Sequence, residues 1–388
     1  MLKMTKSMLA VGVASAVFAG SSNGAELYNN PDVGAVDLGV SYSAFILQGK
    51  DTNTVEDGAS RLWLIFSKDL GDGWTGFARS EWGVVLTNNV GGVEFVRNTG
   101  GNSLRPAGAD GESFFIRKGF VGIKKDGVGE LTLGKQWGLS YDIGGVTDNF
   151  YVFGGKASGT YNFGIDGGIS GTGRAEQALQ YDVEILGGLD LGVQFQFTDE
   201  TIYIVDDDTG DIIEDTDLAY DNSFAVKVGY TFDFGLMIGA VYNKANLKII
   251  DDAGVLPSLD VSDTLLTFGA SYGSLANKGL YAALVLTTME YHEINDLNSI
   301  MADAMGAELM VKYNFENNWG VHGGFNYLSD ESSGPLNQYE LTHIYLGTDY
   351  QFTKGFSAYI EGVLDSTKGA DGSDIGEDQI GLGFRMDF

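Results

Sequence analysis

The sequence contains no cysteine and only four prolines among 388 residues. The absence of cysteine excludes a disulfide framework and thiolate chemistry. Basic residues are also scarce, since 23 lysines and arginines stand against 53 aspartates and glutamates, which gives a formal net charge of −30. Nucleic acid is therefore excluded as a partner, because its phosphates require clustered lysine and arginine. Carboxylates in this excess favour cations and water as neighbours.

Long hydrophobic runs are missing beyond the first 24 residues, where no apolar stretch approaches the ~18 residues of a transmembrane helix. Only helices and closed barrels satisfy every backbone group in lipid. The mature protein is therefore expected to be either secreted and soluble or a transmembrane β-barrel.

The first segment has the pattern of a secretory signal. Lys3 and Lys6 precede an apolar run over residues 8–19, which is too short to span a bilayer as a membrane anchor. Small residues follow, and we predict cleavage after Gly24, with cleavage after Ala25 as the alternative. Residues 1–24 are thus expected to be a signal peptide, and residues 25–388 to form the mature chain.

Glycine and aromatic residues are abundant, with 57 glycines and an aromatic content of 12%. Several segments alternate strictly between apolar and small or polar residues. Residues 190–197 place Leu191, Val193, Phe195 and Phe197 on one face, and residues 224–232 and 380–388 repeat the scheme. This period of two predicts β-strands with one apolar face. Because a soluble sandwich would alternate in the same way, this pattern alone does not choose between sandwich and barrel.

The lengths of the connections do choose. Short turns are predicted at about 69–73, 124–129, 186–189, 232–235, 274–279, 315–319 and 352–355. Longer polar loops are predicted at about 48–58, 87–111, 138–174, 200–221, 247–261, 292–302, 329–337 and 367–377. Strict alternation of short and long connections is typical of up-and-down transmembrane barrels, whereas sandwiches use Greek-key crossings. We therefore predict an all-β, antiparallel barrel of sixteen strands, which is wide enough to leave an aqueous channel.

Aromatic side chains flank the short turns, namely Trp74, Phe232, Phe234, Phe315, Trp319, Phe352 and Phe356. An interfacial aromatic girdle belongs at this rim, with ordinary packing at strand ends as the alternative.

Short segments distributed along the chain resemble the general bacterial porins, the sixteen-stranded trimeric proteins of the Gram-negative outer membrane. These segments are Ala-Glu-Leu-Tyr-Asn-Asn at 25–30, Phe-Val-Gly-Ile-Lys at 120–124, Gly-Lys-Gln at 134–136, Tyr-Asp at 141–142, Thr-Asp at 147–148, Phe-Gly-Gly at 153–155 and the final Phe388. No single segment is specific, but their order and spacing together are.

The resemblance implies that the third long loop, residues 139–174, folds into the lumen and narrows it. Its acidic residues are then expected to be Asp142 and Asp148. They would face a basic wall made of Arg61, Arg117 and Arg174. Opposed charges across a narrow opening orient polar solutes and sort ions. This chain departs from the family in carrying Val152 in place of a loop glutamate and Ser41 in place of a wall lysine.

The same loop is rich in aromatic residues: Tyr141, Phe150, Tyr151, Phe153, Tyr161 and Phe163. They are expected either to pack the loop against the wall or to line a path for sugars, and packing is the favoured interpretation.

Partners follow from the resemblance as well. It implies a homotrimer in the outer membrane, surrounded by lipid and lipopolysaccharide, and recognition of Phe388 by the barrel-assembly machinery. The alternation of faces breaks down near Arg117 and Lys118 and over residues 131–135. The resemblance places these strands at the trimer interface.

The predicted loop at 200–221 carries nine carboxylates and no lysine or arginine. Asp206, Asp207, Asp208 and Asp211 are candidate ligands for Ca²⁺, but the spacing fails the EF-hand pattern, and a solvated acidic rim is favoured. No other cofactor is expected. The three histidines, His292, His322 and His343, form no metal-binding motif, and we expect no enzymatic activity.

Three functions remain open. The favoured one is a channel for passive diffusion of ions and small hydrophilic solutes, with a preference for cations. The second is a sugar- or oligosaccharide-selective channel. The third is a plugged barrel that acts as a surface enzyme or adhesin.

Overall fold

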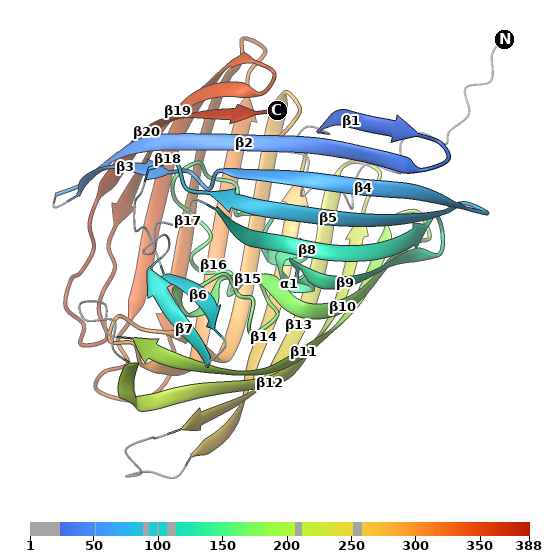
Figure 1. Cartoon of the computed structure of the whole chain (residues 1–388). Helices are drawn as coiled ribbons and strands as arrows, with labels where there is room; N and C mark the ends of the chain where they lie inside the picture. The colour runs from blue at the N-terminus through green and yellow to red at the C-terminus, as the bar shows by residue number, and fades with distance from the viewer. Residues whose placement is uncertain are drawn as a thin grey trace.

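The computed structural model describes residues 24–50, 52–87, 93–98, 101–106, 114–205, 212–250 and 258–388. Within these residues almost all regular structure is β, in one sheet that winds round a barrel (Figure 1). The wall consists of β2 (Gly34–Gln48), β4 (Arg61–Gly71), β5 (Trp74–Val84), β8 (Phe114–Lys125), β9 (Gly129–Trp137), β10 (Arg174–Ile185), β11 (Leu189–Val205), β12 (Ile212–Thr231), β13 (Leu236–Ile250), β14 (Leu259–Tyr272), β15 (Gly279–Ile294), β16 (Ile300–Asn314), β17 (Trp319–Asp330), β18 (Glu340–Thr353), β19 (Phe356–Asp365) and β20 (Gln379–Asp387).

The sheet closes on itself. Each wall strand pairs antiparallel with the next, and β20 pairs with β2. The amide of Val40 donates to the carbonyl of Phe388, and the amide of Phe388 donates to the carbonyl of Val40, both at 2.8 Å. Closure removes the free strand edges that an open sheet would expose. The described chain therefore confirms the predicted sixteen-stranded antiparallel barrel.

The remaining elements lie in the connections. β1 (Ala25–Asn30) forms a hairpin with β2, and β3 (Asn53–Asp57) pairs with the far end of the same strand. β6 (Val93–Asn98) and β7 (Gly101–Pro106) form a hairpin between β5 and β8, which pair directly with each other. The helices are α1 (Leu139–Gly144) and the 3-10 turn η2 (Asn162–Gly164). In the described part of the chain, no helix is long and apolar enough to cross a membrane.

Three predicted loops are shorter than expected. The long loop at 200–221 is wrong over most of its length, because β11 continues to Val205 and β12 begins at Ile212, with Asp199 paired to Asp221. The predicted loops at 247–261 and 292–302 are also shorter, because the flanking strands extend into both ends of each predicted range. The charged residues of the segment at 200–221 are typical of a loop, which is why a loop was predicted. Between them stand β-branched and aromatic residues such as Ile202 and Tyr220, which favour β-strand pairing.

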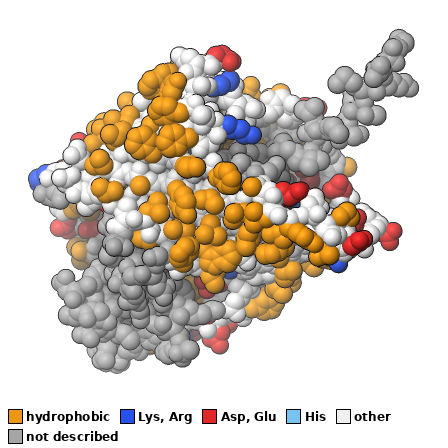
Figure 2. Space-filling model, turned by 45° about the horizontal axis from the view of Figure 1, so that its top comes forward, with side chains coloured by type: hydrophobic (Ala, Val, Ile, Leu, Met, Phe, Trp, Pro, Cys, Tyr) orange, Lys and Arg blue, Asp and Glu red, His pale blue; other side chains and the backbone are white. Residues whose placement is uncertain are grey.

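The two faces of the wall differ as the alternation predicts. On β11, Val193 and Phe195 are 53% and 41% exposed and point outward, whereas Gln194 and Gln196 are 3% and 0% exposed and point inward. Hydrophobic side chains accordingly form a broad band over the outer surface (Figure 2). Aromatic residues at the short turns are also exposed, including Phe234 at 64% and Phe352 at 53%. Their exposure agrees with a girdle at this rim.

A β-bulge explains the irregular pattern at Arg117 and Lys118. Glu81 of β5 pairs with Lys118, but the next residue, Trp82, pairs with Ile116, so Arg117 is an extra residue in β8. A bulge re-aims side chains by adding one residue to a strand. Both Arg117 and Lys118 are buried as a result, at 9% and 4% exposure.

The connection from β9 to β10, residues 138–173, packs against the inner face of the wall, and Figure 1 shows α1 within the outline of the barrel. Leu139 and Ile143 of α1 contact Ala225 and Val241. Glycine in the wall permits this close approach, because a Cβ at Gly306 would lie 1.8 Å from the carbonyl oxygen of Ala157.

Candidate functional site

Two buried wall carboxylates hold the loop of residues 138–173, which we call the inner loop. Glu308 of β16 accepts from the amide of Ala157 at 2.7 Å and from the hydroxyl of Thr147. Glu361 of β19 accepts from three successive amides, those of Tyr151, Val152 and Phe153, at 3.0, 3.0 and 2.8 Å. Both glutamates are 0% exposed. Each one replaces lost hydration by charge-assisted hydrogen bonds, which are the stronger kind.

A histidine ties the middle of the inner loop to the wall. Nε2 of His292 lies 2.6 Å from the carbonyl oxygen of Gly159, which can only accept. Its Nδ1 lies 2.5 Å from the carboxylate of Asp263, which also accepts from the hydroxyl of Tyr220 at 2.7 Å. Both ring nitrogens therefore face acceptors, and the ring bridges loop and wall as a charged imidazolium.

Asp142 occupies a different place from the one predicted. Its carboxylate lies 2.7 Å from Nζ of Lys227 on β12, and Asp182 and Asp190 lie 2.9 Å from the same ammonium. The expectation that Asp142 pairs across the lumen with the arginines is thus replaced by an ion pair that fixes α1 to the wall. Leu139 and Ile143 of α1 pack against the wall. Because Asp142 lies three residues after Leu139, it shares this face of the helix and also points to the wall.

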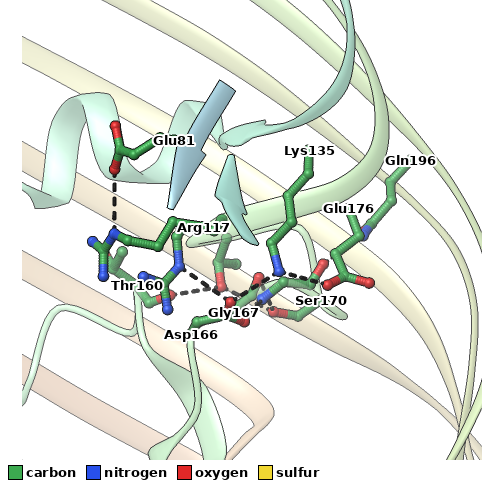
Figure 3. Close-up of polar contacts among 12 residues, drawn as sticks. Glu81, Arg117, Lys135, Thr160, Asp166, Gly167, Ser170, Glu176 and Gln196 are labelled. Atoms are coloured by element: carbon green, nitrogen blue, oxygen red, sulfur yellow. Dashed lines mark hydrogen bonds and ion pairs between the residues drawn. The ribbon is translucent and has the colours of Figure 1, made fainter. Parts of the chain in front are cut away.

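The predicted basic wall is larger than three arginines and contains an acid at its centre. Glu81 of β5 is 2% exposed and contacts three cations, Arg79 at 2.7 Å, Lys118 at 3.0 Å and Arg117 at 3.2 Å. Figure 3 shows the contact between Glu81 and Arg117. Arg61 lies nearby on β4. Among the described residues, Arg61 has no carboxylate within 4.0 Å.

The third predicted arginine belongs to a separate network at the end of the inner loop. Arg174 lies 3.1 Å from Asp166. Lys135 joins Asp166 and Glu176 at 3.2 and 2.7 Å (Figure 3). Burial alone would raise the pKa of Asp166, but the charges of Arg174 and Lys135 outweigh it and hold that pKa at about 2. The network closes the loop with a permanently charged carboxylate.

Asp148 is the loop acid that remains near the basic wall. Its Oδ2 accepts from the hydroxyl of Tyr161 at 2.7 Å and, more weakly, from that of Tyr141 at 3.4 Å. Burial raises the pKa of Asp148, and the two phenols, Arg61 and Lys156 act in the opposite direction. Burial also raises the pKa of Tyr161 far above its ordinary value, so the phenol stays a neutral donor.

The six loop aromatics all contact other rings. Tyr141 stacks on Trp137 with 3.7 Å between centroids, Tyr151 stacks on Tyr359 at 4.5 Å, and Tyr161 meets Trp137 edge-on at 6.3 Å. Phe150 and Phe153 pack on Tyr345, and Phe163 packs on Tyr220. Lys118 and Arg174 also lie over the ring of Trp137. These contacts favour packing over a sugar path, because they occupy ring surface that a sugar would need.

Apart from Glu308 and Glu361, the charges of these clusters balance in sum but are separated in space. The cluster at Glu81 has two excess positive charges, and the cluster at Lys227 has two excess negative charges. Arg61 is matched by Asp148, and the network of Arg174 is neutral. The positive cluster lies on β5 and β8 and the negative cluster on α1 and β10 to β12, so an electric field runs between them along this part of the wall.

Two places in the described chain carry residue types that hydrolases use. Gly269 to Gly273 have the spacing Gly-x-Ser-x-Gly, but Ser271 lies within β14 rather than on a strand-to-helix turn. At the end of β19, Asp365 and Thr367 both approach Nε2 of His343, and the opposite ring nitrogen, Nδ1, lies 3.0 Å from the hydroxyl of Tyr345. No group of metal-ligating side chains is found in the described residues. The candidate Ca²⁺ ligands Asp206, Asp207, Asp208 and Asp211 lie outside the described residues, as does the predicted signal peptide up to residue 23.

Sequence reasoning missed the residues that hold the loop: Glu81, Lys227, His292, Glu308 and Glu361. Each is buried on a wall strand, and Lys227 and Glu308 stand between apolar neighbours of an alternating strand. A charged residue at an inward position of a strand was the signal that could have identified them. Their partners on the inner loop could not be assigned, because the sequence does not show the path of that loop.

Comparisons with known proteins agree on one family. The model of the Gram-negative porin family matches residues 7–370. The major outer membrane protein of Pasteurella multocida is 25% identical, over 99% of this chain and 100% of that protein. Outer membrane porin F of Xenorhabdus nematophila is 24% identical, over 92% of each chain. The structure of Salmonella typhi OmpF in complex with daunomycin has a TM-score of 0.68 at 18% identity, and covers 94% of this chain and 100% of that one.

Proposed function

The chain belongs to the Gram-negative porin family and is an outer-membrane protein, and from this premise we propose that it forms a water-filled channel for passive diffusion of ions and small hydrophilic solutes. The proposal is supported chiefly by the inner loop. It is bound to β12, β15, β16 and β19, while the basic residues lie on β4, β5, β8 and β10. A loop so fixed narrows the interior without depending on a bound ligand.

Passage through such a channel needs no conformational change. Charged side chains on the wall and on the inner loop orient the dipole of a hydrated solute as it passes. Solutes are then sorted by size at the inner loop and by charge along the path.

We further propose a preference for cations. The charged clusters around the inner loop cancel, so the local field distinguishes the two signs weakly. The full sequence has a net charge of −30, so carboxylates outside these clusters are in excess and enrich cations at the mouths. Asp148 places one of these negative charges at the narrow part of the path.

A sugar-selective channel is the second candidate, and the loop aromatics are the observation that raised it. Their contacts with other rings make it the weaker candidate, because a sugar path needs open ring faces. A plugged barrel acting as a surface enzyme or adhesin is weaker still, since the family is one of channels.

Single-channel recording of purified protein in a planar bilayer tests the proposal. We expect stepwise conductance that rises in proportion to KCl concentration. Saturable block of the current by a sugar would instead support the second candidate. Folded protein that inserts without producing steps would show a plugged barrel and overturn the proposal.

The remaining partners are proposals as well. We expect a homotrimer in contact with lipid and lipopolysaccharide, assembled by the barrel-assembly machinery through Phe388. Its backbone is already bound to Val40, so truncation at this residue removes the last rung that closes the barrel. Sedimentation in detergent distinguishes a trimer from a monomer.

A further inference from the structure

We propose that Tyr161 is a positioning residue that keeps the carboxylate of Asp148 charged and fixed at the narrow part of the path, and thereby sets the preference of the channel for cations. The inference deepens the proposed function and rests on it. The family resemblance points to Asp148 but assigns no partner to it, whereas the structure does.

The geometry separates two phenols that could serve this purpose. Tyr161 donates to Oδ2 of Asp148 over 2.7 Å, a good length for a hydroxyl donor, whereas Tyr141 reaches the same oxygen only at 3.4 Å. Tyr161 is itself held by its edge-on contacts with Trp137 and Tyr141, both at 6.3 Å. One ordered phenol therefore determines where the carboxylate lies.

Close packing leaves Asp148 little freedom to find another donor. A Cβ at Gly155 would lie 2.8 Å from Oδ1, so the loop backbone passes directly beside the carboxylate. Gly155 has φ +65°, a conformation that glycine adopts readily and that other residues rarely do. The turn after Phe153 thus places backbone against the carboxylate without covering it with a side chain.

The charged form of Asp148 depends on this contact. Burial disfavours the charged carboxylate, and a hydrogen bond from a neutral phenol favours it. Other groups that act on Asp148 or on its phenols come from four further elements: Arg61 of β4, Arg117 of β8, Arg174 of β10 and Glu308 of β16, together with Lys156 of the inner loop. None of these five is hydrogen-bonded to Asp148 in the described structure, so the phenol of Tyr161 gives the carboxylate its shortest hydrogen bond.

The sign of the effect follows. The cation preference contributed by Asp148 is present above the pKa of its carboxyl group and is lost as the pH falls through that value. Removing the donor raises this pKa, so the preference should be lost at a higher pH. A hydrogen bond to the charged form shifts a carboxyl pKa by about one unit, which is the expected shift of the midpoint.

The test measures the reversal potential of single channels in a KCl gradient from pH 8 to pH 3. Tyr161→Phe keeps the ring contacts and removes only the hydroxyl, Tyr141→Phe removes the longer hydrogen bond, and Asp148→Asn removes the charge. Tyr359→Phe is the matched control, because it removes a hydroxyl whose partner is Ser43 rather than a carboxylate. We expect a midpoint about one pH unit higher for Tyr161→Phe, a smaller rise for Tyr141→Phe and no change for the control.

Three outcomes are informative. A raised midpoint for Tyr161→Phe with unchanged single-channel conductance supports the inference. A midpoint like that of the wild type, when Asp148→Asn abolishes the same titration, overturns it and leaves the proposed function intact. If Asp148→Asn matches the wild type at every pH, the proposed role of Asp148 itself fails. Should Tyr161→Phe fail to fold, Tyr161→Leu, which also lacks the hydroxyl, is recorded in its place, and a midpoint like that of the wild type overturns the inference.

Discussion

The amides held by Glu361 give the sharpest test of how the inner loop is fixed. Glu361→Ala removes the acceptor of three backbone amides and the carboxylate that lies 2.8 Å from Nε2 of His322. Removing one member of a buried charged pair costs about 3–5 kcal/mol. Water in the lumen can rehydrate part of the freed backbone, so we expect the lower end, about 3 kcal/mol.

This loss should act on the loop rather than on the barrel. At about 1.4 kcal/mol for each factor of ten, 3 kcal/mol raises the population of the released loop more than a hundredfold. Single-channel traces of Glu361→Ala should therefore show frequent transitions to other conductance levels, and Glu361→Gln, which keeps one acceptor oxygen, should be intermediate. The temperature at which the barrel unfolds on a gel should change little, because the strand ladder of β19 is retained.

Glu340→Ala is the matched control. Glu340 makes one ion pair, at 3.2 Å, with Lys368, which is 53% exposed, so its removal should cost at most about 1 kcal/mol and leave the traces quiet. Traces of Glu361→Ala as quiet as those of the control, with the wild-type conductance, would refute the idea that this carboxylate holds the loop.

Three further predictions concern the interior. Glu81→Gln leaves three cations without their shared acid, so the reversal potential in a KCl gradient should move toward that of Cl⁻, and an unchanged value would show that this cluster lies outside the ion path. Lys227→Met leaves three carboxylates uncompensated and should move the potential toward that of K⁺, with a shift toward Cl⁻ contradicting the assignment. Gly306→Ala puts a methyl group 1.8 Å from the carbonyl oxygen of Ala157, so the loop must shift at a cost of about 1–3 kcal/mol, visible as an altered conductance. Gly119→Ala is the matched control, because a Cβ at this strand position meets no neighbour.

Much of the barrel could be predicted from the sequence because its physical cause is local. A strand with one face toward an apolar surround must alternate, and Val193, Gln194 and Phe195 do so without reference to any other strand. Short and long connections then fix the order of strands. The ends of β11 and β12 were misjudged, because the acidic residues near 199–221 resemble a loop and only the paired strand reveals their place in a ladder.

The site was harder to predict because its partners are far apart in sequence. Asp142 and Lys227 are 85 residues apart, and Glu361 is more than 200 residues from the amides that it binds. Carrying residues over from a family gave Asp148 and the arginines as candidates, but it could not show that Asp142 faces β12. The bulge at Arg117 also escaped notice, since an extra residue in a strand is visible only against its neighbour.

The proposed preference for cations depends on a narrow passage in which a nearly neutral constriction leaves the acidic mouths, with Asp148, to select the ions. Its central test is the reversal potential of the wild-type channel at neutral pH in a KCl gradient, recorded beside Asp148→Asn. We predict a potential on the K⁺ side for the wild type and a smaller one for the variant. A potential on the Cl⁻ side would contradict the account, because the basic residues around Glu81 would then outweigh every carboxylate along the path.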